Sequence, residues 1–324
     1  MRSTEKSTEE TIDPLSVAVI GGGIMGRGIA LALATAGHAV SVVESDTAAA
    51  DALAERIEAA ALATPELSPE SRLAALSRVV LAPELEAAVA SADLVIEAVP
   101  EQLAIKEPIW TRLGQSSSPT AILATNTSAL DIDAIAARVP HRERVIGTHW
   151  FNPANVIPCV EVVRGAETSQ TVVDAVVELL ARAGKQPVVV KNSPGFVANR
   201  IQFALVREAL LCLEEGLATA EDIDAIVSSS FGMRLAVLGP LAHADFGGLG
   251  TYRSILDFLT GQLGERFSTP AILDRLVSEG RLGVSTGAGI SEYDAVRARE
   301  LTAYRDSTLR RVLAAVQAED KPAP

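Results

Sequence analysis

Residues 16–26 of the chain read Ser-Val-Ala-Val-Ile-Gly-Gly-Gly-Ile-Met-Gly. The apolar run before the glycines predicts a buried β-strand, and the apolar periodicity of residues 24–36 predicts a helix. Between the two, Gly21, Gly23 and Gly26 match the pattern G-x-G-x-x-G. A strand, a glycine turn and a helix in this order are typical of the first unit of a doubly wound α/β sheet.

Each of the three glycines has its own task in this motif. Gly21 permits a tight turn, Gly23 lets backbone amides approach a pyrophosphate, and Gly26 lets the helix pack close to the strand. The pyrophosphate is expected at the helix N-terminus, which begins with Ile24 and Met25. The motif therefore predicts a dinucleotide site, with a plain glycine-rich loop as the alternative.

An acidic residue after the second predicted strand indicates which dinucleotide. Residues 39–44 predict a strand that ends at Glu44, about 20 residues past the glycines, where a carboxylate accepts hydrogen bonds from the adenosine ribose. A carboxylate repels a 2′-phosphate, and no Arg or Lys lies between Glu44 and Asp51. Glu44 therefore predicts NAD rather than NADP, and the alternative is a solvated acid at a strand end.

Strands and helices alternate through the first part of the chain. This alternation predicts an α/β fold with a doubly wound, mostly parallel Rossmann sheet. Further strands are expected at residues 93–99, 121–125, 145–149, 159–163 and 187–191. Further helices are expected at 47–62, from the end of the 93–99 strand to about 113, and at 169–183.

From Val197 onward, the apolar residues follow the helical period instead. We therefore expect an all-α C-terminal domain, with helices at residues 197–216, 221–229, 255–263, 271–278 and 301–317. The turn-forming tripeptide Ser193-Pro194-Gly195 predicts the boundary. The predicted organisation is a disordered leader (1–14), an NAD-binding Rossmann domain (15–193) and a helical substrate and dimerisation domain (194–324).

Composition narrows the class of function. The net charge of −13 over 324 residues disfavours binding to nucleic acid. No apolar run is long enough to span a membrane, and the polar N-terminus lacks the apolar core of a signal peptide. The two cysteines, Cys159 and Cys212, fit reduced thiols in a cytoplasmic protein. Neither these cysteines nor the histidines have metal-ligand spacing, so no metal is expected.

Two residues suit the removal of hydride from a carbinol carbon. His149 ends a predicted strand, at the edge where open α/β sheets bind ligands, and a histidine can accept the hydroxyl proton near neutral pH. Glu161 falls inside the apolar run 160–163, and a carboxylate buried in such a run needs a partner. The alternatives are a core histidine and a glutamate on a solvated strand face.

Several segments together resemble the L-3-hydroxyacyl-CoA dehydrogenase family, including its L-gulonate and carnitine dehydrogenase branch. They occur in the family's order, which makes the resemblance specific, and it extends over roughly residues 15 to 295. The segments are His149-Trp150-Phe151-Asn152-Pro153, residues 158–163, residues 191–200, residues 93–101, Asn126-Thr127-Ser128, Glu214-Glu215-Gly216 and residues 221–224.

The resemblance implies the catalytic roles. His149 would be the base and Glu161 its partner. Ser128 and Asn199 match residues that hydrogen-bond the substrate oxygen, where uncharged donors stabilise developing negative charge. Alternatively, Ser128 caps the helix that follows it and Asn199 is a helix-start residue.

The resemblance also implies contacts with the nicotinamide end of the cofactor. Glu101 and Lys106 match family positions near that end, and Asn152 matches a residue that lines the nicotinamide pocket. The alternatives are ordinary solvated charges on a helix face for Glu101 and Lys106, and a turn role before Pro153 for Asn152.

The segments expected to bind CoA depart from the acyl-CoA members. Those members carry lysines where Ser285 and Ala288 stand, and residues 59–78 offer only Arg72 and Arg78 to the phosphates of CoA. The scarcity of Lys and Arg in these segments counts against binding of a CoA nucleotide.

Residues 231–234, Phe-Gly-Met-Arg, resemble the gulonate and carnitine dehydrogenase branch, whose substrates carry no CoA. Arg234 could hold a substrate carboxylate by a bidentate contact, or form a surface ion pair. In contrast, Phe151 and residues 245–249 look closer to the acyl-CoA branch.

We therefore expect NAD-dependent oxidation of a 3-hydroxyacyl thioester, CoA-bound or carrier-bound, or the reverse reaction. The first alternative is a dehydrogenase of a free 3-hydroxy acid. The second is a non-catalytic NAD-binding structural protein, against which the intact catalytic set argues. Apolar positions Leu205, Ala209 and Leu213 are compatible with a homodimer, as the resemblance implies, or with plain core.

Overall fold

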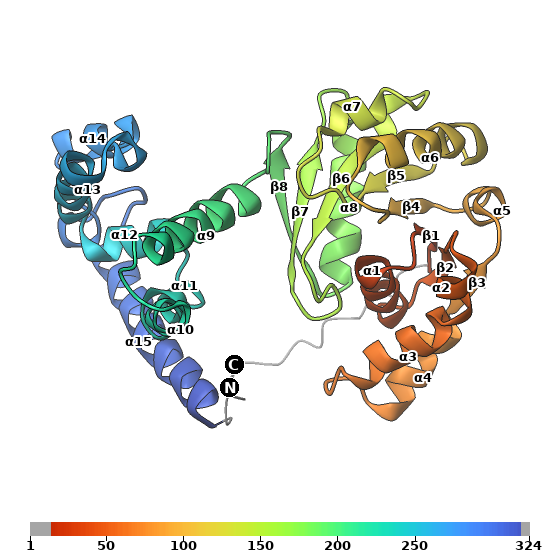
Figure 1. Ribbon diagram of the computed structural model, residues 1–324, viewed down its shortest axis with the longest axis horizontal. Coiled ribbons are helices and arrows are strands. Elements are labelled where there is room, and N and C mark those ends of the chain that lie inside the picture. Colours follow the sequence, from red (N-terminus) through yellow and green to blue (C-terminus); the bar gives the residue numbers. More distant parts are fainter. Residues whose placement is uncertain (1–13, 319–324) are drawn as a thin grey trace, which may run out of the picture. The chain divides into compact units, whose positions relative to one another are not determined.

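The computed structural model describes residues 14–318 (Figure 1). The chain divides into two compact units, one ending at Leu205 and the other beginning at Val206. The predicted leader lies outside the described residues, apart from its last residue.

The first unit is built on an 8-stranded sheet with the order β3-β2-β1-β4-β5-β6-β7-β8. The pairing is parallel throughout except between β6 and β7. The strand order reverses at β1, so a ligand is expected beside the carboxyl end of that strand. The strands are β1 (Ser16–Ile20), β2 (Ala39–Val43), β3 (Val79–Ala82), β4 (Leu94–Glu97), β5 (Ile122–Thr125), β6 (Val145–Trp150), β7 (Cys159–Arg164) and β8 (Gln186–Lys191).

Helices cover both faces of this sheet (Figure 1). One face packs against α1 (Ile24–Thr35), α3 (Leu53–Leu62), α4 (Pro69–Ser77) and α8 (Gln170–Arg182). The other packs against α5 (Leu85–Val89), α6 (Leu103–Ser116) and α7 (Ile132–Ala136). Because side chains alternate along a strand, β1 supplies Val17 and Val19 to the first core and Ala18 and Ile20 to the second. The predicted doubly wound, mostly parallel sheet is confirmed.

Several details of this unit differ from the sequence prediction, which also leaves out the helices α4, α5 and α7. The strand β3 is not predicted, because it is a short edge strand that pairs only with β2 and leaves its middle residues exposed. The helix expected at residues 47–62 is two helices, α2 (Thr47–Asp51) and α3, separated at Ala52.

The second unit is helical, which confirms the predicted all-α part. Helix α9 (Ala198–Glu214) starts in the first unit and continues into the second, so the division falls inside it, later than the predicted boundary at 193–195. The remaining helices are α10 (Ala220–Val227), the π-helical turn η2 (Ser228–Gly232), α11 (Met233–Leu235), α12 (Pro240–Gly247), α13 (Leu249–Leu263), α14 (Ala271–Ser278) and α15 (Ala295–Ala318).

A buried carboxylate organises the loop before α15. Asp245 Oδ1 accepts the amide of Ile290 at 2.8 Å, and its Oδ2 accepts the amide of Ser291 at 3.0 Å and the Tyr293 hydroxyl at 2.8 Å. Ser285 lies earlier in the same loop, and Asp245 holds the later residues of that loop, 290–293.

Over residues 14–318, no single helix combines the length and apolarity needed to cross a membrane. One bent pair, Ala220–Leu235 with Pro240–Gly247, meets that test by length and composition only.

Candidate active site

The glycine motif forms an open cradle at the start of α1. Gly21 has a φ of +104°, and a Cβ there would lie 2.8 Å from the Ala98 carbonyl oxygen. A Cβ at Gly26 would lie 1.8 Å from the Gly21 oxygen, so these two glycines are required by the fold itself. A Cβ at Gly23 would meet nothing within 4 Å, and no side chain caps the helix here. The amides at this N-terminus are therefore accessible to an anion.

The cradle opens into a cavity of about 930 Å³. This volume suits a cofactor, since such sites span about 300–1,000 Å³. The cavity brings together most of the predicted cofactor residues and one predicted substrate residue. They are Gly21, Gly23, Ile24, Met25, Glu44, Glu101 and Ser128.

Glu44 stands directly after β2 with its carboxylate held by backbone amides. Oε2 accepts the Gly22 amide at 2.9 Å, and Oε1 accepts the Asp46 amide at 3.0 Å. The side chain lines the cavity beside the glycine turn, where a carboxylate can accept hydrogen bonds from ribose hydroxyls. This carboxylate acceptor fits a dinucleotide without a 2′-phosphate.

His149 and Glu161 form a buried pair across two strands. They are register partners on the antiparallel strands β6 and β7, and are 4% and 3% exposed. His149 Nδ1 lies 2.8 Å from Glu161 Oε2. Because a carboxylate only accepts, the ring donates from Nδ1, which leaves Nε2 as the basic nitrogen. The ring packs near Phe151 and Phe196, with centroids 4.5 and 5.7 Å away.

The other oxygen of Glu161 is bound by the start of the segment leading into α9. Oε1 accepts the amides of Val197 at 3.1 Å and Ala198 at 3.0 Å. Burial alone would raise the pKa of Glu161, but the hydrogen bonds from His149 and the two amides outweigh it, and the pKa is lowered. Glu161 is therefore held as a carboxylate facing the imidazole.

Ser128 and Asn199 are brought together by the structure. The Asn199 side-chain amide donates to the Ser128 carbonyl at 2.7 Å. Helix α7 is capped by Asp131 rather than by Ser128, so the capping alternative is wrong. Among residues 14–318, the Ser128 hydroxyl has no protein hydrogen-bond partner, and Ser128 lines the cavity.

Asn152 lies two residues after the end of β6, is exposed, and is not among the residues that line the cavity. The loop behind it is held by a residue that the sequence does not point out. The Lys185 ammonium donates to the carbonyls of Ala154, Asn155 and Ile157 at 2.7, 3.2 and 3.0 Å. The nicotinamide contact of Asn152 stays a prediction.

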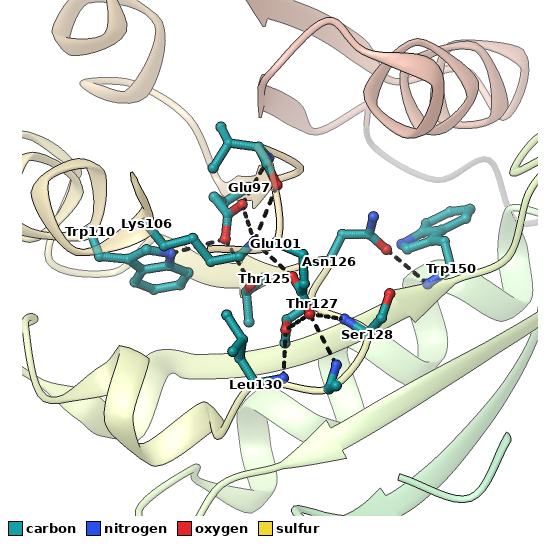
Figure 2. Close-up of polar contacts among 12 residues, drawn as sticks. Glu97, Glu101, Lys106, Trp110, Thr125, Asn126, Thr127, Ser128, Leu130 and Trp150 are labelled. Carbon is teal, nitrogen blue, oxygen red and sulfur yellow. Dashed lines mark hydrogen bonds and ion pairs between the residues drawn. The ribbon is translucent and has the colours of Figure 1, made fainter. Parts of the chain in front are cut away.

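Lys106 lies in the interior of the first unit. Figure 2 shows its side chain beside Glu97 and Glu101. Its side chain is 0% exposed and pairs with Glu97 at 2.6 Å and Glu101 at 3.4 Å. The alternative of a solvated surface charge is therefore wrong for Lys106. It does not line the cavity, whereas Glu101 does, and a cofactor contact by Lys106 stays a prediction.

Sequence reasoning missed Glu97. The available signal was a carboxylate inside the apolar strand β4, where an acid needs a partner.

Arg234 belongs to the second unit, where it lines a separate cavity of about 420 Å³ with His243 and Arg305. Burial, and then the charges of Arg234 and Arg305, lower the pKa of His243. Arg305 pairs with Asp306 at 2.8 Å, whereas Arg234 has no ion-pair partner in the part of the chain that the structure describes. The surface ion-pair alternative is therefore wrong, and the cavity wall carries Arg234 as an unpaired cation of the described residues beside the Arg305–Asp306 pair.

Among the described residues, no group of three or more His, Cys, Asp or Glu side chains is placed to hold a metal ion. The first cavity is lined by backbone amides, carboxylates, neutral side chains and the guanidinium of Arg112.

Comparison with known proteins agrees with this cradle and fold. The family model for the NAD binding domain of 3-hydroxyacyl-CoA dehydrogenase matches residues 16–193, and the model for its C-terminal domain matches residues 195–293. The chain is thus an NAD-dependent oxidoreductase. It belongs to the 3-hydroxyacyl-CoA dehydrogenase family.

Three relatives illustrate the range of this similarity. The 5-formyl-3-hydroxy-2-methylpyridine 4-carboxylate 5-dehydrogenase of Mesorhizobium japonicum is 34% identical over 299 residues, covering 90% of this chain and 97% of the relative. The mitochondrial hydroxyacyl-coenzyme A dehydrogenase of Sus scrofa is 32% identical, covering 90% and 95%. The crystal structure of the 3-hydroxyacyl-CoA dehydrogenase of Archaeoglobus fulgidus superposes with a TM-score of 0.76 at 32% identity, covering 92% and 99%.

Proposed function

We propose that the protein oxidises a 3-hydroxyacyl thioester, carried by CoA or by a carrier protein, to the 3-oxoacyl form, or catalyses the reverse. The observation that carries the proposal is the buried His149–Glu161 pair, 2.8 Å apart at opposite positions of two paired strands. His149 Nε2 takes the hydroxyl proton as the carbinol carbon becomes a carbonyl. NAD supplies the acceptor for the hydride that leaves that carbon.

Glu161 acts through the histidine. Its carboxylate fixes the proton on Nδ1 and stabilises the positive charge that the ring gains with the substrate proton. The amides of Val197 and Ala198 hold the other carboxylate oxygen in place. Glu161 is therefore fixed, and its hydrogen bond to Nδ1 keeps the His149 ring in its orientation.

Ser128 and Asn199 are assigned to the substrate oxygen. The Ser128 hydroxyl is free to donate a hydrogen bond there, and Asn199 holds the backbone of Ser128. A donor aimed at an oxygen that gains negative charge favours the reaction in both directions.

The residues that would hold NAD are those of the cradle. The amides at Gly23, Ile24 and Met25 suit its pyrophosphate, and Glu44 suits its adenosine ribose. Glu101 stands on the same cavity wall as Ser128 and is proposed to face the nicotinamide half.

The arginines expected to meet CoA are engaged by the protein. Arg72 donates to the carbonyls of Ala61 and Leu67 at 3.1 and 3.3 Å, and Arg78 donates to Ala34 at 3.4 Å. A thioester substrate would therefore bind mainly through its acyl and pantetheine parts, which suits a carrier-bound chain as well as CoA.

The second candidate is a free hydroxy acid, and the presence of Arg234 in the second cavity favours it. Arg234, His243 and Arg305 offer donors to a carboxylate beside the aromatic rings of Phe246 and Tyr252. The Mesorhizobium relative is named for a pyridine carboxylate, which is a substrate without CoA.

A substrate panel with two variants tests both candidates. The panel holds 3-hydroxybutyryl-CoA, a carrier-bound 3-hydroxyacyl chain, free 3-hydroxybutyrate and the pyridine carboxylate. His149→Ala should lose about 10²–10⁴-fold in kcat on the true substrate while NAD still binds. Arg234→Ala should leave KM unchanged for a thioester. A panel in which only free acids turn over, with a KM that depends on Arg234, would replace the thioester proposal.

We also propose that the protein is a cytoplasmic homodimer. On α9, Leu205 is 37% exposed and Leu213 is 42% exposed within one chain, so these two are not plain core. Light scattering coupled to size exclusion should give twice the chain mass of 33.9 kDa. A monomer at micromolar concentration would contradict the dimer, and a fluorescent fusion tests the location.

A further inference from the structure

A buried carboxylate at the end of β4 is surrounded by hydrogen-bond donors (Figure 2). Glu97 Oε1 accepts the Lys106 ammonium at 2.6 Å and the Val99 amide at 2.8 Å. Its Oε2 accepts the Trp110 indole at 3.1 Å and the Thr125 hydroxyl at 2.8 Å. Glu97, Lys106 and Trp110 are all fully buried. The network therefore joins the ends of β4 and β5 to helix α6.

The donors require a carboxylate at this position. A glutamine carries one accepting oxygen and one donating NH₂ group. In one orientation its NH₂ would face the Lys106 ammonium and the Val99 amide, and in the other it would face the Trp110 indole. Either orientation leaves a buried donor unpaired, so the four donors together require a carboxylate, and Lys106 is the cation among them.

Lys106 connects this interior carboxylate to a second one at the cavity wall. Its ammonium lies 2.6 Å from Glu97 and 3.4 Å from Glu101, whose side chain is 37% exposed. A single cation thus contacts two carboxylates, one buried and one lining the first cavity. The position of Glu101 depends on that of Lys106.

Glu101 in turn binds the turn that carries Ser128. Its Oε1 accepts the Thr127 hydroxyl at 2.6 Å and the amides of Ser128 and Ala129 at 2.7 and 3.0 Å. Burial would raise the pKa of Glu101, but the Thr127 hydrogen bond, the charge of Lys106 and the two amides outweigh it and lower the pKa. The carboxylate is therefore a fixed acceptor for three donors of one turn.

We propose that Lys106 is a positioning residue: anchored on Glu97, it orients Glu101, and Glu101 sets the Thr127-Ser128-Ala129 turn so that the Ser128 hydroxyl faces the reacting oxygen. The role given to Ser128 rests on the proposed function, whereas the positioning of the turn by Glu101 does not. Asn199 holds the same turn from its other side through the Ser128 carbonyl.

The expected kinetic effect is a loss of turnover. Loss of a donor to a developing oxyanion costs about 10²–10³-fold in kcat. Displacing the donor without removing it should cost less, so Lys106→Met should lower kcat by about ten-fold to a hundred-fold. The dissociation constant of NAD is measured separately, because Lys106 contacts Glu101, which lines the cavity and is expected beside the nicotinamide half.

The test compares Lys106→Met with Glu107→Gln. Glu107 is the next residue on α6 and pairs at the surface with Arg138, outside the network. Amide hydrogen exchange reports the turn without any substrate. In Lys106→Met the amides of Ser128 and Ala129 should exchange at least ten-fold faster, while in Glu107→Gln they keep the wild-type rate.

A double variant separates positioning from loss of folding. Lys106→Met leaves two carboxylates without their cation. Glu97→Gln/Lys106→Met removes the buried charge as well, and it should melt at a higher temperature than Lys106→Met, although one buried donor stays without an acceptor. The proposal expects the exchange at Ser128 and Ala129 to stay fast and kcat to stay low in this double variant. Recovery of slow exchange and of kcat together with stability would show a merely structural pair and overturn it. If the wild-type enzyme turns over no compound of the panel, the proposed function fails, and the exchange rates still decide whether Lys106 orders the turn.

Discussion

Replacing Glu161 by glutamine should disable the histidine through its tautomer. The carboxylate accepts from His149 on one oxygen and from the amides of Val197 and Ala198 on the other. Glutamine has only one accepting oxygen, so it can serve the amides or the ring, but not both.

The structure decides which way the glutamine turns. If its NH₂ group faced Val197 and Ala198, two backbone donors would lose their acceptor, at about 1–3 kcal/mol each, or about 2–6 kcal/mol together. Its oxygen should therefore stay with the amides and its NH₂ group should face His149. The ring must then accept at Nδ1 and carry its proton on Nε2, so it cannot take the substrate proton. The expected loss is that of the general base, about 10²–10⁴-fold in kcat, or about 2.7–5.4 kcal/mol of barrier.

The assay is NADH absorbance under saturating substrate, with NAD affinity measured separately by fluorescence. Glu143→Gln is a matched control, since Glu143 is an exposed acid near His141 with no role in the pair. The variant should fold, bind NAD normally and lose turnover. A Glu161→Gln enzyme that keeps more than a tenth of the wild-type kcat would refute the tautomer argument.

Three further predictions concern the cofactor, the substrate and acid stability. Glu44→Ala should lower the ratio of kcat/KM for NAD over NADP, and an unchanged ratio would remove Glu44 from cofactor selection. Arg234→Ala should weaken a free acid by about 1.5–3 kcal/mol, seen as a raised KM, and the absence of any rise on free acids would exclude Arg234 as their partner. The pKa values of Glu101 and Glu161 are both lowered in the fold, so their stabilisation is complete above the unfolded value of about 4.3 and is lost as pH falls through the lower folded values. Thermal unfolding from pH 7 to pH 3 should show this loss, and Glu161→Gln should flatten it; identical slopes for wild type and variant would count against it.

The sequence predicts the structure best at positions where the local geometry admits only one type of residue. At Gly21 and Gly26 a Cβ would collide with backbone atoms, so only glycine fits there. The glycine motif in the sequence therefore predicts the turn. The central strands are buried on both faces and are therefore apolar along their length, which makes them easy to recognise. The strand β3 lacks this property because it pairs on one side only and its middle residues are exposed.

Side-chain partners from distant segments are harder to predict. The hydrogen bond between Asn199 and Ser128 spans 71 residues of sequence, and the contact of Asn192 with Asp131 spans 61. The periodicity of apolar residues in the sequence does not reveal such pairs, because they depend on how helices and loops pack on the sheet. A resemblance to known sequences can supply roles for Ser128 and Asn199, but not the hydrogen bond that joins them.

The two buried glutamates show how far the physical argument reaches without the structure. Glu97 and Glu161 each lie in an apolar strand, and each must find donors, because an isolated buried charge is too costly. That argument predicts a partner for both. For Glu161 the partner follows from the sheet, since His149 is its register neighbour on β6. For Glu97 the register neighbour is Thr125, which supplies one donor, but the cation comes from Lys106 on α6. A strand residue can thus be paired from topology alone when its partner lies on the next strand, whereas a partner on a covering helix becomes visible only once the helix is packed.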